Sequence, residues 1–294
     1  MYRQNHHLVF YLLLAMAALV FAGKLQAQNL AYEGETGIYI TPLAYTVASP
    51  KNNVGTPSFA FHFLQAGNVV GSFSQISVTE GAFSRLEFGY TRDIHTTADK
   101  PELSPLWHDG FNIFHAKVNV LPENLRKHMW VPAISAGFIT RSQLHNIGGA
   151  IFDKDTNNSD VYIVATKTIV FPKLHGLPLV LNGGFRGTNA ELFGVGGNAT
   201  RFEGRSFGAV GFGLKGPWKS VFLLASEVSQ QPPHPEGLGT AVIPTTITYA
   251  FRLIPLPERK FNIDLGVAQL ANRIAPGVEL HARNQFGMGV SYSF

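Results

Sequence analysis

The chain has 294 residues, of which 14% are charged and 12% are aromatic, with 30 glycines and no cysteine. The lack of cysteine excludes a disulfide scaffold and any thiolate metal site. The formal net charge is only +4 and no long run of lysine or arginine occurs, so a nucleic-acid partner is not expected. Low charge together with many aromatic residues and glycines is typical of a wall of alternating β-strands.

The first 27 residues have the pattern of a secretory signal peptide. Arg3 begins a weakly basic start, residues 8–22 are an unbroken apolar run, and Ala27 is the small residue that a signal peptidase requires. We therefore assign residues 1–27 to a signal peptide that is cleaved after Ala27. A permanent anchor is the alternative, but the run is shorter than the roughly 20 residues that a helix needs to cross a bilayer.

Residues 28–55 fit a strand poorly. Gly34 and Gly37 favour turns, and Pro42 has no N–H group to donate to a β-ladder. This segment is predicted to be either a plain lead-in to the first strand or a segment that plugs the mouth of a barrel.

Residues 56–294 contain about twelve stretches in which apolar and polar side chains alternate with a period of two. Alternation of this kind over many short stretches is typical of a transmembrane antiparallel β-barrel, so the predicted fold class is all-β with about 12 strands. The predicted strands are 56–65, 69–79, 83–93, 110–120, 129–140, 160–170, 177–187, 205–215, 218–229, 241–253, 259–270 and 283–294.

The connections between these stretches alternate between short and long, with residues 66–68 as the one exception. Short periplasmic turns and long outer loops are expected of a bacterial barrel, whereas a soluble β-sandwich, the alternative for this pattern, has no reason to keep the alternation. The predicted location is therefore the cell outer membrane, with membrane lipid around the barrel.

The last predicted strand ends the chain on an aromatic residue, with apolar side chains on one face and small or polar ones on the other. Such a strand resembles the C-terminal signal of Gram-negative outer-membrane barrels, in which the barrel assembly machinery reads a final Phe. The resemblance implies that the assembly machinery is a partner and that the signal consists of Phe286, Val290, Tyr292 and Phe294.

The same alternation places charged side chains opposite the apolar face of several strands. A lipid-facing Arg or Lys near the membrane midplane costs roughly 2 to 4 kcal/mol, so these charged faces are expected to point into the lumen. The candidates that line the lumen are Arg85, Glu87, Asp93, His115, Lys117, Arg186, Glu227 and Asp264.

These candidates carry both signs of charge, which leaves two interpretations open. They could form a polar pore or ligand site, or they could form internal salt bridges that merely fill the barrel. A barrel of this size has a narrow interior and buried charges need partners, which favours the second interpretation.

Two short patterns match catalytic or nucleotide-binding motifs in spacing alone. Residues 204–208 fit GxSxG and residues 211–216 fit GxGxxG, but neither is followed by the helix that these motifs require. The histidines are scattered without a metal-ligand spacing. We therefore expect no enzyme activity, no cofactor and no metal.

Three segments, 85–88, 160–167 and 181–187, resemble an uncharacterised family of Gram-negative outer-membrane β-barrel proteins. Residues 37–44, with Thr41 and Pro42, are similar to the start of barrels associated with exopolysaccharide export. Both resemblances imply the barrel fold and the outer membrane, and neither implies a catalytic residue.

The expected function is a conduit or a surface binding protein for a small solute. The alternative is a structural or partner protein of an envelope or exopolysaccharide export complex.

Overall fold

The computed structural model describes residues 30–97, 107–145, 157–171, 177–190, 202–232, 243, 245–255, 260–270, 273–275, 278–279 and 284–294. The predicted signal peptide lies outside the described residues, so its cleavage after Ala27 stays a prediction. In this part of the chain, no helix is long and apolar enough to cross a membrane.

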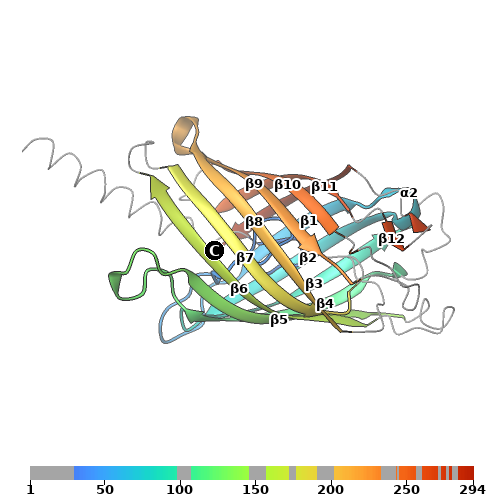
Figure 1. Cartoon of the computed structure of the whole chain (residues 1–294), viewed down its shortest axis with the longest axis horizontal. Coiled ribbons are helices and arrows are strands. Elements are labelled where there is room, and N and C mark those ends of the chain that lie inside the picture. The colour runs from blue at the N-terminus through green and yellow to red at the C-terminus, as the bar shows by residue number, and fades with distance from the viewer. Residues whose placement is uncertain are drawn as a thin grey trace, which may run out of the picture.

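Within the described residues, twelve strands close into one antiparallel β-barrel (Figure 1). The closure joins β1 to β14, with Ser58 opposite Ser293. Each of the twelve predicted stretches corresponds to one strand, which confirms the predicted fold class. The strands are β1 (Ser58–Gln65), β2 (Ser72–Ala82), β3 (Leu86–Thr96), β4 (Phe111–Leu121), β5 (Ala133–Gln143), β6 (Asn158–Phe171), β7 (Leu177–Thr188), β8 (Glu203–Lys215), β9 (Val221–Gln230), β10 (Thr245–Ile254), β11 (Phe261–Gln269) and β14 (Gln285–Ser293).

Short elements lie in the connections between these strands. A four-residue helix, α2 (Gly67–Val70), joins β1 to β2, and two 3-10 turns, η2 (Leu125–Lys127) and η4 (Pro217–Lys219), join β4 to β5 and β8 to β9. β12 (Arg273–Ala275) and β13 (Val278–Glu279) form a small separate sheet between β11 and β14.

Side chains alternate between the two faces of the wall, as β14 shows most clearly. Its even-numbered residues, from Phe286 to Tyr292, are exposed on the outside, and its odd-numbered residues, from Gln285 to Ser293, are buried inside. Every strand places apolar side chains on the outside in the same way; the exposed ones include Phe61, Ile76, Phe88, Phe114, Phe138, Ile163, Phe185, Phe212, Leu224, Tyr249 and Leu265. A closed wall with an apolar outer band satisfies its backbone internally and suits hydrocarbon, so the barrel lies in the outer membrane.

The two ends of the barrel differ in the lengths of their connections. At the end that holds Ser58 and Phe294, the β2–β3 turn spans only residues 83–85. Phe83 and Ser84 have positive φ angles of 53° and 58°, the twist that a tight antiparallel turn requires. At the opposite end the connections 97–110, 144–157, 189–202, 231–244 and 270–284 are long. The first end is therefore the periplasmic end and the second the outer end.

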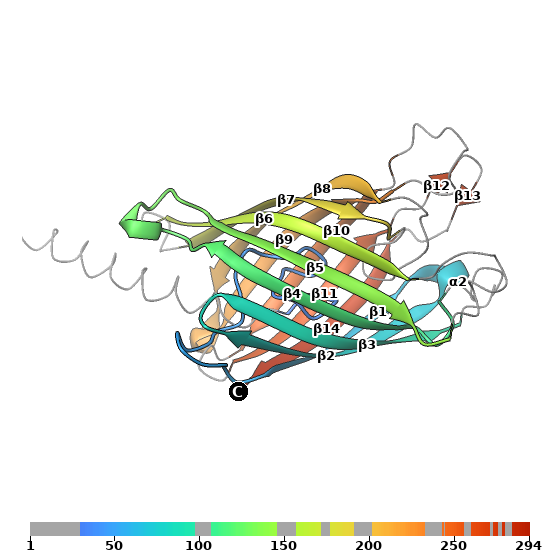
Figure 2. The same cartoon turned by 90° about the horizontal axis from the view of Figure 1, so that it is seen from below.

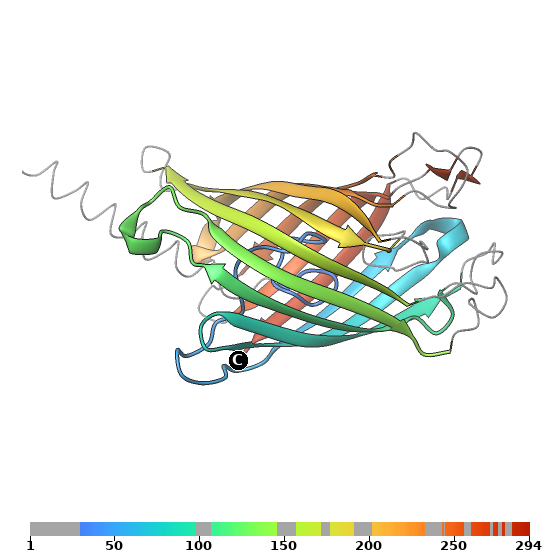
Figure 3. The same cartoon turned by 60° about the horizontal axis from the view of Figure 1, so that its bottom comes forward.

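The interior of the barrel contains the segment that precedes β1. Figures 2 and 3 show this segment, in blue, as a compact trace inside the ring of strands. We call residues 30–47 the plug segment. Its residues 30–44 are all buried, and residues 48–57 then connect it to the start of β1 at the periplasmic end.

Candidate functional site in the barrel interior

The plug segment is folded tightly but contains no regular strand or helix. Isolated bridges join Leu30 to Thr36 and Gly37 to Pro42. Buried backbone N–H and C=O groups outside regular structure still need hydrogen-bond partners. Side chains of the barrel wall supply many of these partners. Most of the buried charged side chains of the wall contact the plug segment or belong to an ion pair that does.

Glu227, on β9, holds the middle of the plug segment. Its carboxylate accepts hydrogen bonds from the backbone N–H groups of Tyr39 and Ile40 at 3.1 Å and of Thr41 at 2.8 Å. The Thr41 hydroxyl donates to the same carboxylate at 2.6 Å. A buried carboxylate that accepts several N–H groups is stabilised without a cation, so Glu227 is satisfied by the plug segment itself.

A second anchor joins β3 and β4 to the plug segment at Thr36, Leu43 and Val47. The Glu87 carboxylate accepts hydrogen bonds from the backbone N–H groups of Thr36 and Val47, both at 2.8 Å. Lys117 Nζ lies 3.0 Å from Glu87 Oε1 and donates to the carbonyl oxygens of Thr36 and Leu43 at 3.0 and 3.1 Å. This buried ion pair therefore holds the plug segment in two ways, because Glu87 accepts from its N–H groups and Lys117 donates to its carbonyl oxygens.

A third anchor lies on β10 and β11. Arg252 Nε donates to Asp264 Oδ1 at 2.5 Å, so the guanidinium is fixed by a neighbouring strand. Its Nη2 and Nη1 groups donate to the carbonyl oxygens of Ile38 at 2.6 Å and Gly37 at 3.2 Å. Arg252 therefore donates to the plug segment while Asp264, also a wall residue, neutralises its charge.

A fourth anchor is a cluster of charges near the outer end. Arg141, on β5, binds the Glu33 carboxylate with two parallel hydrogen bonds, Nε to Oε1 at 2.5 Å and Nη2 to Oε2 at 2.6 Å. The same Nη2 donates to Asp160 Oδ2 on β6 at 2.9 Å, and Arg186 Nη1 on β7 lies 3.5 Å from that oxygen. Glu33 is thus the one plug carboxylate that an arginine of the described wall binds.

Glu35, the other acidic residue of the plug segment, has a different environment. It is completely buried, and neither carboxylate oxygen has a hydrogen-bond partner within the described residues. Burial, followed by the nearby charge of Glu33, raises the pKa of the Glu35 carboxyl to about 8.

The structure places seven of the eight predicted lumen residues in the buried interior: Glu87, Asp93, His115, Lys117, Arg186, Glu227 and Asp264. The eighth, Arg85, does not line the lumen. It lies in the β2–β3 turn, where its exposed side chain donates to the carbonyl oxygen of Val120 at 3.2 Å. The prediction for Arg85 was wrong because β3 begins at Leu86 rather than at residue 83, so Arg85 precedes the alternation.

Four functional candidates did not appear in the prediction: Glu33, Arg141, Asp160 and Arg252. Arg252 follows Phe251 and precedes Leu253 on β10, so the alternation already indicated an inward side chain. Arg141 lies beyond residue 140, where the predicted strand ended too early. Glu33 lies in an irregular segment, and no sequence pattern identifies its partner.

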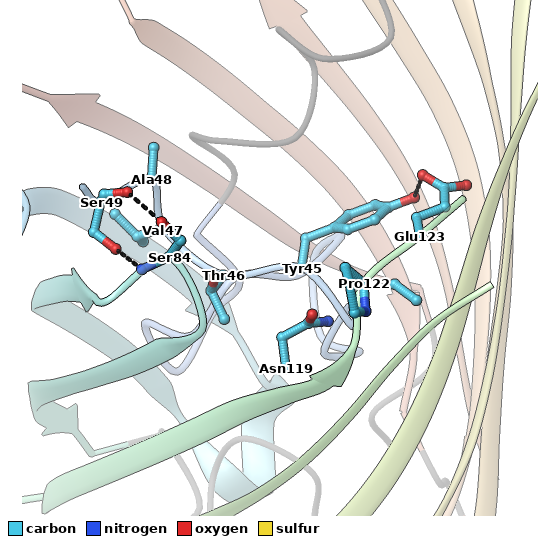
Figure 4. Close-up of a pocket in the computed structure, with 10 residues that line it drawn as sticks. Tyr45, Thr46, Val47, Ala48, Ser49, Ser84, Asn119, Pro122 and Glu123 are labelled. Atoms are coloured by element: carbon cyan, nitrogen blue, oxygen red, sulfur yellow. Dashed lines mark hydrogen bonds between the residues drawn. The ribbon is translucent and has the colours of Figure 1, made fainter. Parts of the chain in front are cut away.

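A cavity of about 290 Å³ lies at the periplasmic end, where residues 45–49 lead out of the interior (Figure 4). Tyr45 Oη lies 3.0 Å from Glu123 Oε2, and the Ser84 N–H donates to Ser49 Oγ at 2.9 Å. Residues 45–49 are therefore attached to the wall at two points, Tyr45 and Ser49, with open space beside them. Among the described residues, no group of three or more acidic or histidine side chains could hold a metal ion.

Taken together, the closed wall, the apolar outer band and the filled interior define a porin-like outer-membrane β-barrel with an internal plug segment. Residues 29–211, more than half of the chain, match the family described as "Protein of unknown function (DUF3034)". The chain belongs to this family. No curated protein matches the sequence closely enough to be counted as a relative.

Several solved structures of outer-membrane proteins are similar to the chain. The NanC porin is 8% identical, with a TM-score of 0.50 over 80% of this chain and 100% of its own. The KdgM porin is 10% identical, with a TM-score of 0.46 over 81% of this chain and 99% of its own. An outer-membrane channel from Pseudomonas putida F1 is 8% identical, with a TM-score of 0.44 over 84% of this chain and 97% of its own. At these identities the similarity concerns the fold alone.

Proposed function

We propose that the protein is a gated conduit for a small solute, with the plug segment as its gate. The observation that carries this proposal is that residues 30–44 are buried inside the barrel while their backbone is held by wall side chains rather than by strand pairing. Side-chain contacts of this kind can be broken without opening the wall, because the strand pairs of the barrel do not depend on them.

The arrangement of the contacts supports a gate more than permanent filler. Lys117 and Arg252 each have a wall carboxylate, Glu87 and Asp264, so both cations keep a partner if the plug segment leaves. A buried charge that loses its partner costs about 3 to 5 kcal/mol, and these two pairs avoid that cost. The cavity beside residues 45–49 gives the connection room to move.

The alternative is a structural or partner protein of an envelope or exopolysaccharide export complex. The burial of residues 30–44 and the many contacts that hold them also suit a barrel that never opens. The two functions differ in whether a solute passes through the barrel and across the membrane.

Liposome swelling tests the proposal. Vesicles that contain the wild-type protein should admit a small neutral sugar slowly, and Glu227→Ala should admit it faster because three plug N–H groups lose their acceptor. Thr246→Ala is the matched control, since Thr246 is a buried wall residue that accepts from Gln231, the residue after β9, and not from the plug segment. Equal and negligible swelling for all three assembled proteins would favour the structural alternative.

A further inference from the structure

The bond between Glu33 and Arg141 differs from the other contacts of the plug segment. Elsewhere the wall binds backbone and hydroxyl groups of the segment, whereas Arg141 binds a side-chain carboxylate with two parallel hydrogen bonds of 2.5 and 2.6 Å. Two parallel bonds from one guanidinium are the geometry by which arginine recognises a free carboxylate. Both side chains are completely buried.

The charges that ion pairs join to this bond do not balance without Glu33. Arg141 and Arg186 carry two positive charges, and Asp160 and Glu33 carry two negative ones, so the joined cluster has a net charge of 2 − 2 = 0. If the plug segment leaves, the cluster keeps 2 − 1 = +1. Arg141 is then a buried cation that shares the Asp160 carboxylate with Arg186, which favours binding of another anion.

The position of the cluster suits a solute that arrives from outside the cell. Arg141 lies two residues before the outer end of β5, Asp160 two residues after the outer start of β6, and Arg186 two residues before the outer end of β7. Arg186 also donates to Ser229 Oγ at 2.8 Å, which fixes the second guanidinium in the same place.

We propose that Arg141, with Arg186 and Asp160 beside it, is a binding site for a carboxylate-bearing solute and that Glu33 occupies this site as an internal substitute. This inference rests on the proposed function, since the site opens to solute only when the plug segment moves. The preference for an anion is a local property of this cluster and not of the whole lumen. The described interior of the wall holds five carboxylates, Glu87, Asp93, Asp160, Glu227 and Asp264, against four cations, Lys117, Arg141, Arg186 and Arg252.

Chemical rescue tests the site in the full-length protein. Glu33→Ala removes the atoms of an acetate group from the cluster, so added acetate should bind there and restore the temperature at which the folded, fast-migrating band is lost on a detergent gel. Acetamide has the same size without the charge, and sodium chloride at equal ionic strength controls for a general salt effect. We expect acetate to raise this temperature in Glu33→Ala, and acetamide and chloride to leave it unchanged.

Glu35→Ala is the matched control variant. It removes the same side chain from the same segment, but Glu35 makes no hydrogen bond through its carboxylate within the described residues. Acetate should not raise the transition temperature of Glu35→Ala or of Glu33→Ala combined with Arg141→Gln. If Glu33→Ala assembles poorly, the yield of refolding with acetate compared with acetamide gives the same answer.

Equal effects of acetate and acetamide on Glu33→Ala would overturn the carboxylate site. This readout does not depend on transport. A barrel that shows acetate rescue but admits no solute would contradict the conduit alone, and a barrel that admits solute without acetate rescue would contradict the site alone.

Discussion

Glu227 and Thr41 are 186 residues apart in the sequence, yet the Glu227 carboxylate accepts both the backbone N–H of Thr41 at 2.8 Å and its hydroxyl at 2.6 Å. This contact joins β9 to the middle of the plug segment and is typical of how the interior is held. In this contact the segment contributes backbone and hydroxyl groups, and the wall contributes the charge.

Removal of the Glu227 carboxylate should loosen the plug segment while the wall stays closed. Glu227→Ala leaves three buried N–H groups without their acceptor, at a cost of about 1 to 3 kcal/mol for each group that water does not reach. The expected result is a lower transition temperature on a heat-shift gel and faster proteolysis of residues 30–47. A transition temperature equal to that of Thr246→Ala would show that the contact contributes nothing to stability.

Stability should also depend on the packing between Gly287 and Tyr39. A Cβ atom at Gly287 would overlap the Tyr39 hydroxyl, whereas a Cβ atom at Gly183 would meet nothing within 4 Å. Overpacking of a tight interior costs about 1 to 3 kcal/mol, so Gly287→Ala should destabilise the plugged barrel and Gly183→Ala should not. Thermal unfolding followed by circular dichroism compares the two variants, and equal midpoints would contradict the close packing of Tyr39 on β14.

Stability should depend on pH through Glu35. Burial raises the pKa of its carboxyl from 4.5 to about 8, so between these values the native state holds a proton that the unfolded chain has lost. The native state then binds more protons, and stability should fall as the pH rises through this window. Glu35→Gln should flatten the dependence and be the more stable protein at the alkaline end. An unchanged pH profile in Glu35→Gln would show that this carboxyl is not responsible.

The aromatic end of the chain should control assembly. Phe294 lies in edge contact with Tyr292 at 4.9 Å and with Phe59 at 5.7 Å between ring centroids, on the outer surface at the seam of the barrel. Phe294→Ser with Tyr292→Ser should reduce the amount of assembled protein in outer-membrane fractions far more than two serines in the connection before β6, at residues 153–157. Equal amounts of the two variants would exclude the last strand as the recognised signal.

The fold could be predicted almost completely from the sequence, because alternation is a local property of each strand. The apolar face of β14 and the inward positions of Glu87, Lys117 and Glu227 all follow from parity alone. Errors arose where the predicted end of a strand was misplaced. Arg85 precedes β3, and Arg141 lies on a part of β5 that the predicted strand did not include.

The contacts of the plug segment could not be predicted in the same way. Arg141 and Glu33 are 108 residues apart, and the Tyr39 N–H and Glu227 are 188 residues apart. Such pairs depend on how an irregular segment is placed in three dimensions, and no periodic pattern records that placement. The sequence did indicate that residues 28–55 are unlike a strand, which left a plug segment as one of two interpretations.

Electrical conductance in planar bilayers tests most directly whether the plug segment closes a conduit. The full-length protein should give brief, rare openings, and a variant that lacks residues 30–44 should give steady current in an otherwise intact barrel. Each protein is first checked for assembly by its heat shift on a detergent gel. Steady current only after removal of the segment is the predicted result, and a correctly assembled variant without residues 30–44 that stays silent would contradict the gated conduit.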